Sequence, residues 1–237
     1  MKKESLTVAE AKALHQAGQL EAAKEAYLHF LSTHPRDTTA LHLLALLYAE
    51  QGEMNAAQQY LEQALIVQPA DPVLSLHLAN VLKEKGLFSQ AALVLQDVIR
   101  LHPHYAAAFN NLGTLYFAQQ KWQEAVSAYQ TAIDKQADYL DAYYNLGLAL
   151  RKLKRGQEAQ HVFIALLELA PEHAGGQFQL GQLFMEQHRY QDAIPHFLNL
   201  AHTHPFHFET LTNLATCYLK GGRLDQAKQY YLQAQIK

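Results

Sequence analysis

Histidine is the residue type in this sequence that first suggests chemistry. The chain has 14 histidines, and His202, His204 and His207 lie together in the segment AHTHPFH. Imidazole is a common ligand of transition metals, so such a cluster could hold an ion. However, His34, His102 and His204 each stand directly before a proline. That position favours pairing with free carbonyl groups at a helix C terminus, and we expect no metal site.

The sequence offers little for covalent catalysis. Its single cysteine, Cys217, precedes Tyr218 on a helical stretch and has no histidine nearby in sequence, which favours a small core residue over a nucleophile. One cysteine cannot form an internal disulfide, which indicates a reducing environment. No glycine-rich phosphate loop, HExxH or GxSxG motif occurs. We expect no catalytic residue, no cofactor and no enzymatic activity in this chain.

A row of carboxamides forms a more regular polar pattern. The residue before a recurring leucine carries an amide in four of five repeats, the row being His77, Asn111, Asn145, Gln179 and Asn213. A carboxamide offers a donor and an acceptor together, so such a row can hydrogen-bond the main chain of an extended peptide without reading its side chains. The alternative is that these amides only tolerate solvent on a helix surface.

Composition indicates a globular, mostly helical protein. Of 237 residues, 49% are apolar and 17% are charged, with 11 Gly and 7 Pro. Lys and Arg number 19 against 22 Asp and Glu, a net charge of -3, which disfavours nucleic acid as a partner. The start MKKESLTVAE lacks the apolar run of a signal peptide, and the stretch LHLLALLYAE is too short for a membrane span. We expect a cytoplasmic protein that binds no membrane.

The elements that carry these residues follow from an internal period of 34 residues. Alanine recurs at this step, without insertion or deletion, at Ala23, Ala57, Ala91, Ala125, Ala159, Ala193 and Ala227. Proline does so at Pro35, Pro69, Pro103, Pro171 and Pro205. A leucine followed by a small residue recurs at Leu44, Leu78, Leu112, Leu146, Leu180 and Leu214. Large apolar residues recur at Tyr27, Leu61, Leu95, Tyr129, Phe163, Phe197 and Tyr231.

Each 34-residue unit has the pattern of a helical hairpin. A further large residue lies four positions after each leucine and shares one helix face with it. These residues are Tyr48, Leu82, Tyr116, Leu150, Phe184 and Tyr218. The small residue beside the leucine allows a second helix to approach closely. A turn glycine separates the two helices, and the proline prevents the second helix from continuing. The turn glycines are Gly18, Gly52, Gly86 and Gly222.

This pattern resembles the tetratricopeptide repeat. The resemblance covers almost the whole chain as one domain, 1–237, in the units 4–37, 38–71, 72–105, 106–139, 140–173, 174–207 and 208–237. It implies an all-α fold: a right-handed superhelical solenoid of antiparallel hairpins, whose concave groove is lined by the first helices. The carboxamide row is similar to the asparagine ladder in the repeat arm of O-linked N-acetylglucosamine transferases.

The resemblance also implies which residues line the groove. Peptide-binding side chains are expected in repeats 4 to 7, as a mixed wall of amides, aromatic rings and one arginine. These residues are Asn110, Asn111, Thr114, Tyr144, Asn145, Arg151, Phe178, Gln179, Gln182 and Asn213. Exposed aromatic rings beside amides suit a peptide better than a small charged metabolite.

Several departures from the repeat predict local structure. Thr7 and Glu10 form a capping-box pattern, which predicts a late start and a short first helix in repeat 1. Gln120, Lys154 and His188 replace the turn glycine in repeats 4 to 6, which predicts backbone strain there. Pro195 lies early in the second helix of repeat 6 and predicts a kink or a late start.

Three functional hypotheses follow. The first is a protein-interaction scaffold that binds an extended peptide segment of a protein partner in its groove. The second is the substrate-docking arm of an enzyme, a glycosyltransferase or a methyltransferase, whose catalytic domain follows residue 237, so that this chain is the N-terminal part of a longer protein. The third is self-association through an uncapped C-terminal hairpin, where Tyr230, Tyr231 and Ile236 offer apolar surface.

Overall fold

The computed structural model describes residues 7–204 and 207–235, and within these ranges the regular elements are all α-helices. The chain divides into two compact units, Met1–Gln120 and Lys121–Lys237, called unit 1 and unit 2 below. The all-α prediction is confirmed. One continuous solenoid over 1–237 stays a prediction, and each unit is described by itself.

The helices follow the predicted repeats closely. Unit 1 contains α1 (Val8–Gln16), α2 (Leu20–Thr33), α3 (Thr38–Glu50), α4 (Met54–Val67), α5 (Pro72–Glu84), α6 (Phe88–Leu101) and α7 (Ala106–Ala118). Unit 2 contains α8 (Trp122–Lys135), α9 (Leu140–Lys152), α10 (Gly156–Leu169), α11 (Ala174–Glu186), α12 (Tyr190–Thr203), α13 (Phe208–Lys220) and α14 (Leu224–Ala234). Odd-numbered helices are the first helices of the repeats and even-numbered helices are the second helices.

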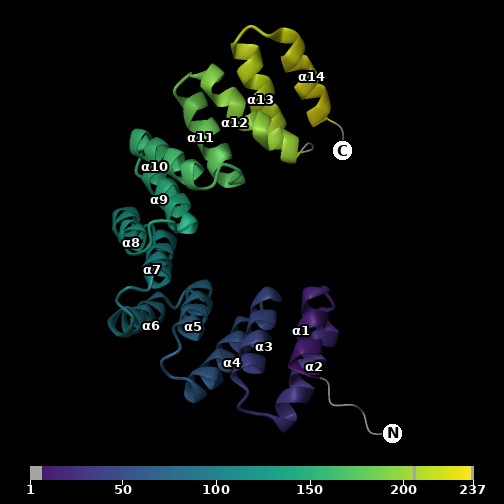
Figure 1. Cartoon of the computed structure of the whole chain (residues 1–237), viewed down its shortest axis with the longest axis vertical. Coiled ribbons are helices and arrows are strands. Elements are labelled where there is room, and N and C mark those ends of the chain that lie inside the picture. Colours follow the sequence, from purple (N-terminus) through teal and green to yellow (C-terminus); the bar gives the residue numbers. More distant parts are fainter. Residues whose placement is uncertain (1–6, 205–206, 236–237) are drawn as a thin grey trace. The chain divides into compact units, whose positions relative to one another are not determined.

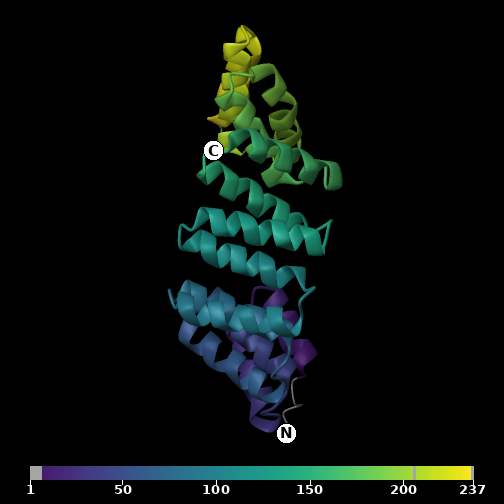
Figure 2. The same ribbon diagram turned by 90° about the vertical axis from the view of Figure 1, so that its left-hand side faces the viewer.

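Within each unit, consecutive helices pack as antiparallel hairpins that stack in chain order (Figures 1 and 2). In unit 2, for example, α9 contacts α10, α10 contacts α11, and α11 contacts α12. The large apolar series lies at these contacts: Tyr27, Leu61, Leu95, Tyr129, Phe163 and Phe197 are at most 2% exposed. The 34-residue period therefore maps directly onto the core of each unit.

The small residue after the leucine performs its predicted role. A Cβ atom placed on Gly147 would lie 2.4 Å from Cζ of Phe163, and one on Gly181 would lie 2.7 Å from Cζ of Phe197. Real Cβ atoms do not approach other carbon atoms this closely, so only glycine fits beneath these rings. The close approach of first and second helices in these two hairpins depends on it.

Each turn between a first and a second helix contains one residue in the left-handed region of backbone conformation. Gly18, Gly52, Gly86 and Gly222 have φ angles of 74 to 78°. Where glycine is absent, Gln120, Lys154 and His188 take the same region, with φ of 60, 60 and 59°. The predicted strain is confirmed, because a Cβ atom makes this region costly for an ordinary residue.

Helix starts confirm one prediction and overturn another. Helix α1 begins at Val8 behind a complete capping box of Thr7 and Glu10, and it has 9 residues where the other first helices have 13. In contrast, α12 begins at Tyr190, in the same register as the other second helices, with Pro195 inside it. The predicted late start at Pro195 is therefore wrong, while its alternative, a kink, stays a prediction. Burial of the neighbouring Ala193, Ile194 and Phe197 holds the helix in register.

A second capping series appears at the start of the first helices. Asp37 and Asp71 cap α3 and α5 through their carboxylates, and His173 and His207 cap α11 and α13 by accepting a main-chain N–H on Nδ1. These four residues keep the 34-residue step. His207, first considered as a metal ligand, thus has a structural role as an N-cap.

Candidate functional site

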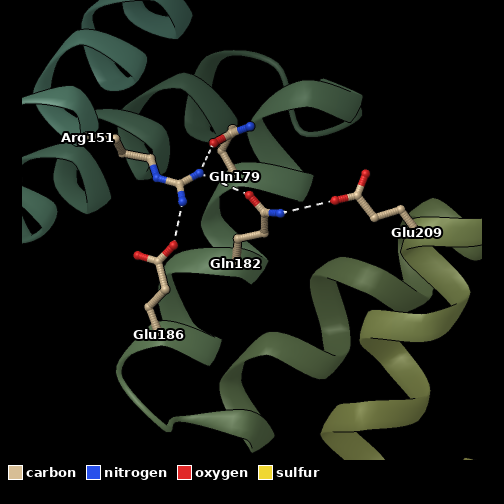
Figure 3. Close-up of polar contacts among 5 residues, drawn as sticks. All are labelled: Arg151, Gln179, Gln182, Glu186 and Glu209. Carbon is tan, nitrogen blue, oxygen red and sulfur yellow. Dashed lines mark hydrogen bonds and ion pairs between the residues drawn. The ribbon is translucent and has the colours of Figure 1, made fainter.

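A polar network joins three successive first helices of unit 2 (Figure 3). Arg151 lies in the last turn of α9, Gln179, Gln182 and Glu186 lie on α11, and Glu209 lies in the first turn of α13. The spacing of three and four residues along α11 places its three members on one helix face. These five residues are called the arginine network below.

Arg151 is the centre of the network. Its Nη1 donates to Oε1 of Gln179 and, at 3.0 Å, to Oε1 of Gln182. Its Nη2 donates to Oε1 of Glu186 at 2.5 Å. The planar guanidinium group suits this arrangement, because it presents several N–H donors in a fixed geometry.

Gln182 extends the network to the next repeat. Its Oε1 accepts from Arg151 while its Nε2 donates to Oε1 of Glu209 at 3.4 Å. Both ends of one carboxamide are therefore used to connect α9 with α13 through α11. Figure 3 shows Gln182 between the two charged groups, with Gln179 and Glu186 on the side of Arg151.

The network is only partly withdrawn from solvent. The Arg151 side chain is 23% exposed, whereas that of Glu186 is 58% exposed. Ion pairs at such exposure contribute about 0–1 kcal/mol to stability because water screens the charges. The network therefore fixes the position of Arg151 more than it stabilises the fold.

Gln179, predicted for the carboxamide row, and Gln182, predicted for the groove wall, both lie in this network. The carbonyl oxygens of Gln179 and Gln182 both accept from Arg151. The Nε2 group of Gln179 can therefore still donate to an acceptor on a partner. The structure thus brings three predicted residues together and gives them a shared geometry.

The two predicted aromatic residues lie at junctions between repeats. Tyr144 on α9 packs against Phe163 and against His173, the N-cap of α11, at ring-centroid distances of 6.2 and 5.3 Å. Phe178 on α11 repeats this arrangement one unit later, against Phe197 at 6.0 Å and the N-cap His207 at 6.1 Å. Both residues are half-buried, so each serves packing and is also partly accessible to solvent.

The remaining carboxamides are divided between the units. Asn145 and Asn213 are half-buried on α9 and α13 in unit 2, while Asn111 and Thr114 are half-buried on α7 in unit 1. The Thr114 hydroxyl donates to the main-chain oxygen of Asn110 at 3.0 Å.

Asn110 departs from the expectation. Its side chain was expected on the groove wall, but the residue is only 7% exposed. Its place on the inward face of α7, where Ala106, Gly113 and others are also buried, explains this. A partner would have little access to it, and it leaves the set of contact residues.

Two residues of the network were missed from the sequence. Glu186 and Glu209 lie outside the carboxamide row. Glu186 shares its repeat position with Glu50 and Glu84, but the two repeats before it carry Ala118 and Lys152 there, so no unbroken acidic series marks it. The available signal was local: Glu186 follows Gln182 by four positions and Gln179 by seven, which places it on the same helix face.

Other candidate chemistry finds structural explanations. Among residues 7–204 and 207–235, no group of three or more His, Cys, Asp or Glu side chains is arranged to hold a metal ion. His102 Nε2 lies 3.2 Å from the main-chain oxygen of Ala70, so this histidine does pair with a carbonyl, although the carbonyl belongs to the preceding repeat. Cys217 is 0% exposed, and burial raises the pKa of its thiol to about 11.

None of the helices formed by the described residues combines the length and apolarity that crossing a bilayer requires.

Family models match the chain over most of its length. A tetratricopeptide repeat model matches residues 8–73, 144–198 and 178–237, and a second one matches 48–116. A TPR repeat model matches 113–154. The chain belongs to the tetratricopeptide repeat family. The TPR resemblance seen in the sequence is thereby confirmed, while the closer likeness to a transferase repeat arm stays a prediction.

Solved TPR structures share this fold at low sequence identity. A structure titled as a functional characterization of Pseudomonas aeruginosa pilF is 21% identical, with a TM-score of 0.71, over 83% of this chain and 89% of that one. YrrB, described as a TPR protein with an unusual peptide-binding site, is 20% identical, with a TM-score of 0.61, over 73% and 90%.

A third solved structure is part of a larger assembly. A chain of the APC/C hetero-tetramer Cut9–Hcn1 is 18% identical, with a TM-score of 0.69, over 91% of this chain and 44% of that one. At these identities the likeness supports the fold alone. No curated protein matches the sequence significantly.

Proposed function

We propose that this TPR protein is an interaction scaffold that binds an extended peptide segment of a partner protein on the first helices of unit 2. The observation that carries the proposal is the arginine network, which presents partly exposed polar groups from α9, α11 and α13 in one continuous row. The surface formed by these three helices is called the first-helix surface.

The chemistry of this surface matches a peptide main chain. Asn213 on α13 and the free amide hydrogens of Gln179 can donate to peptide carbonyl groups, and the oxygens of Glu186 and Glu209 can accept from peptide N–H groups. Main-chain contacts of this kind give affinity with little dependence on the peptide sequence. We therefore expect modest affinity and loose sequence preference.

The network also reduces the cost of binding. Arg151 would lose side-chain freedom if a ligand had to immobilise it, at about 0.5–1.5 kcal/mol. Its three acceptors on α11 already hold it in place. The partly exposed Tyr144 and Phe178 can add apolar contact area at low entropic cost, because aromatic side chains have few rotatable bonds.

A comparative pull-down from native lysate tests the proposal. The wild-type chain is compared with the double variant Gln182→Leu/Asn213→Leu, in which two polar groups of the first-helix surface are removed. The matched control is Gln130→Leu/Lys228→Leu, which alters exposed positions on the second helices α8 and α14. Circular dichroism verifies the fold of both variants.

Partners lost from the first variant and retained by the control would support the proposal. Partners retained equally by both variants would contradict it and would direct attention to the second helices. Limited proteolysis of a recovered partner then identifies the bound segment, which we expect to be extended and without a shared side-chain motif.

A further inference from the structure

One hairpin of the chain lacks a side chain that the other six possess. The second helices of the other hairpins each open with a large apolar or aromatic residue: Leu20, Met54, Phe88, Trp122, Tyr190 and Leu224. Helix α10 opens with Gly156 instead. Five of the six large residues are half-buried, so the position normally contributes packing area between adjacent hairpins.

The backbone gives no reason for this glycine. The left-handed turn residue of the hairpin is Lys154, with φ of 60°, and Gly156 lies two residues later inside the first turn of α10. A Cβ atom on Gly156 would meet only Cδ2 of Leu183, at 3.8 Å, which is ordinary van der Waals contact. Neither a positive φ nor a close approach requires glycine here, in contrast to Gly147 beneath the Phe163 ring.

A hollow lies beside this glycine. A cavity of about 590 Å³ lies at Gly156, between the start of α10 and the end of α11. Gly156 and Leu183 supply apolar lining, and the polar groups come from Gln157, Gln160, His161, Glu186, Gln187 and Arg189. Its volume falls within the range of about 300–1,000 Å³ that is typical of ligand sites.

We propose that this hollow receives a tryptophan or tyrosine side chain of a partner protein. The repeats themselves indicate the occupant, because an aromatic or large apolar side chain opens the second helix of each other hairpin and is half-buried in five of the six. Here that side chain would come from the partner and not from the chain itself. This docking site adjoins the first-helix surface and shares Glu186 with it, but its other lining residues are outside the main-chain contacts proposed there.

The polar lining selects an aromatic ring that carries a hydrogen-bond donor. Nε2 of Gln187 donates to Oε1 of Gln160 at 2.9 Å, and Arg151 holds the carboxylate of Glu186 at 2.5 Å. These contacts fix acceptor oxygens around an apolar centre. An indole N–H or a phenol O–H can donate to such an oxygen while the ring lies against Leu183. An aliphatic side chain would cover the same oxygens without satisfying them.

Titration of the isotope-labelled chain with N-acetyl-tryptophanamide, followed by amide resonances, tests the proposal. We expect saturable shifts at Gly156, Gln157 and Gln187, with a dissociation constant on the order of 1 mM, as suits a small ligand. N-acetyl-leucinamide should bind more weakly at these amides. Absence of saturable shifts there up to the solubility limit of the tryptophan probe would overturn the proposal.

Variants at Gly156 provide the matched controls. Gly156→Trp and Gly156→Leu should fill the hollow and weaken probe binding by about tenfold or more. Gly156→Ala leaves the hollow open and should bind the probe as the wild type does. Unchanged binding by both filled variants would overturn the proposal. Since Gln182 and Asn213 are intact in all three variants, the outcome is independent of the pull-down on the first-helix surface.

Discussion

Replacing Lys154 with glycine should stabilise the protein. Lys154 occupies the left-handed turn position with φ of 60°, whereas the glycines at the equivalent turns reach 74 to 78°. Its side chain is exposed, so removing it sacrifices little packing. The substitution therefore reports mainly on the backbone.

The magnitude follows from two opposing effects. An ordinary residue in the left-handed region costs about 1–2 kcal/mol relative to glycine. Glycine also makes the unfolded chain more flexible, which lowers the unfolding free energy by about 0.4–1 kcal/mol and offsets part of the stabilisation. We expect a net stabilisation of about 0.5–1 kcal/mol, or an increase in the urea midpoint of about 0.3 M at a typical slope.

Urea unfolding followed by circular dichroism at the helical band measures this shift. Lys154→Ala is the matched control, because it removes the same side chain but keeps the Cβ atom and the strain. It should leave the midpoint unchanged or lower it. Equal midpoints for the glycine and alanine variants would refute the assignment of strain to this turn.

Three further predictions concern packing, protonation and thiol reactivity. Gly147→Ala should lower the unfolding free energy by about 1–3 kcal/mol in a thermal melt, because its Cβ atom would lie 2.4 Å from the buried ring of Phe163; an unchanged melting temperature would contradict this. Burial lowers the pKa of His42. The pKa of His77 is lowered by burial and also by the charge of His42, since the two ring centroids are 4.8 Å apart. The unfolded chain then binds more protons, so stability should fall as the pH drops from about 7 to about 5, and His42→Gln/His77→Gln should flatten this part of a urea-midpoint profile. Cys217 should react with a thiol reagent at neutral pH only after denaturant is added, since burial raises its thiol pKa to about 11; rapid labelling of the native chain would disprove its burial.

Much of the fold could be predicted because the 34-residue period determines both local structure and packing. The period located the hairpins, and the turn position identified Gln120, Lys154 and His188 as strained residues. Each of these predictions depends only on contacts within one repeat, or on contacts with the same repeat positions in the next repeat. Because the period sets which residues meet, these contacts recur in each repeat.

The candidate site was less predictable because it depends on differences between repeats. The pairing of Arg151 with α11 requires the relative register of two first helices, which the sequence does not state. Asn110 and Asn111 are adjacent in sequence, yet a rotation of 100° along the helix leaves one buried and the other half-exposed. The hollow at Gly156 shows the same limit: a glycine in a repeat predicts a turn, but here the turn lies two residues earlier.

The central claim, that a partner segment binds the first-helix surface of unit 2, is tested most directly by site-specific photocrosslinking in native lysate. A benzophenone amino acid is placed at the half-buried Met185 on α11, three residues after Gln182 and outside the arginine network, in one variant and at the exposed Gln130 on α8 in the other. We predict protein adducts from position 185, mapped to an extended partner segment, and none of these adducts from position 130. The same adducts from both positions, or adducts from position 130 alone, would contradict the claim.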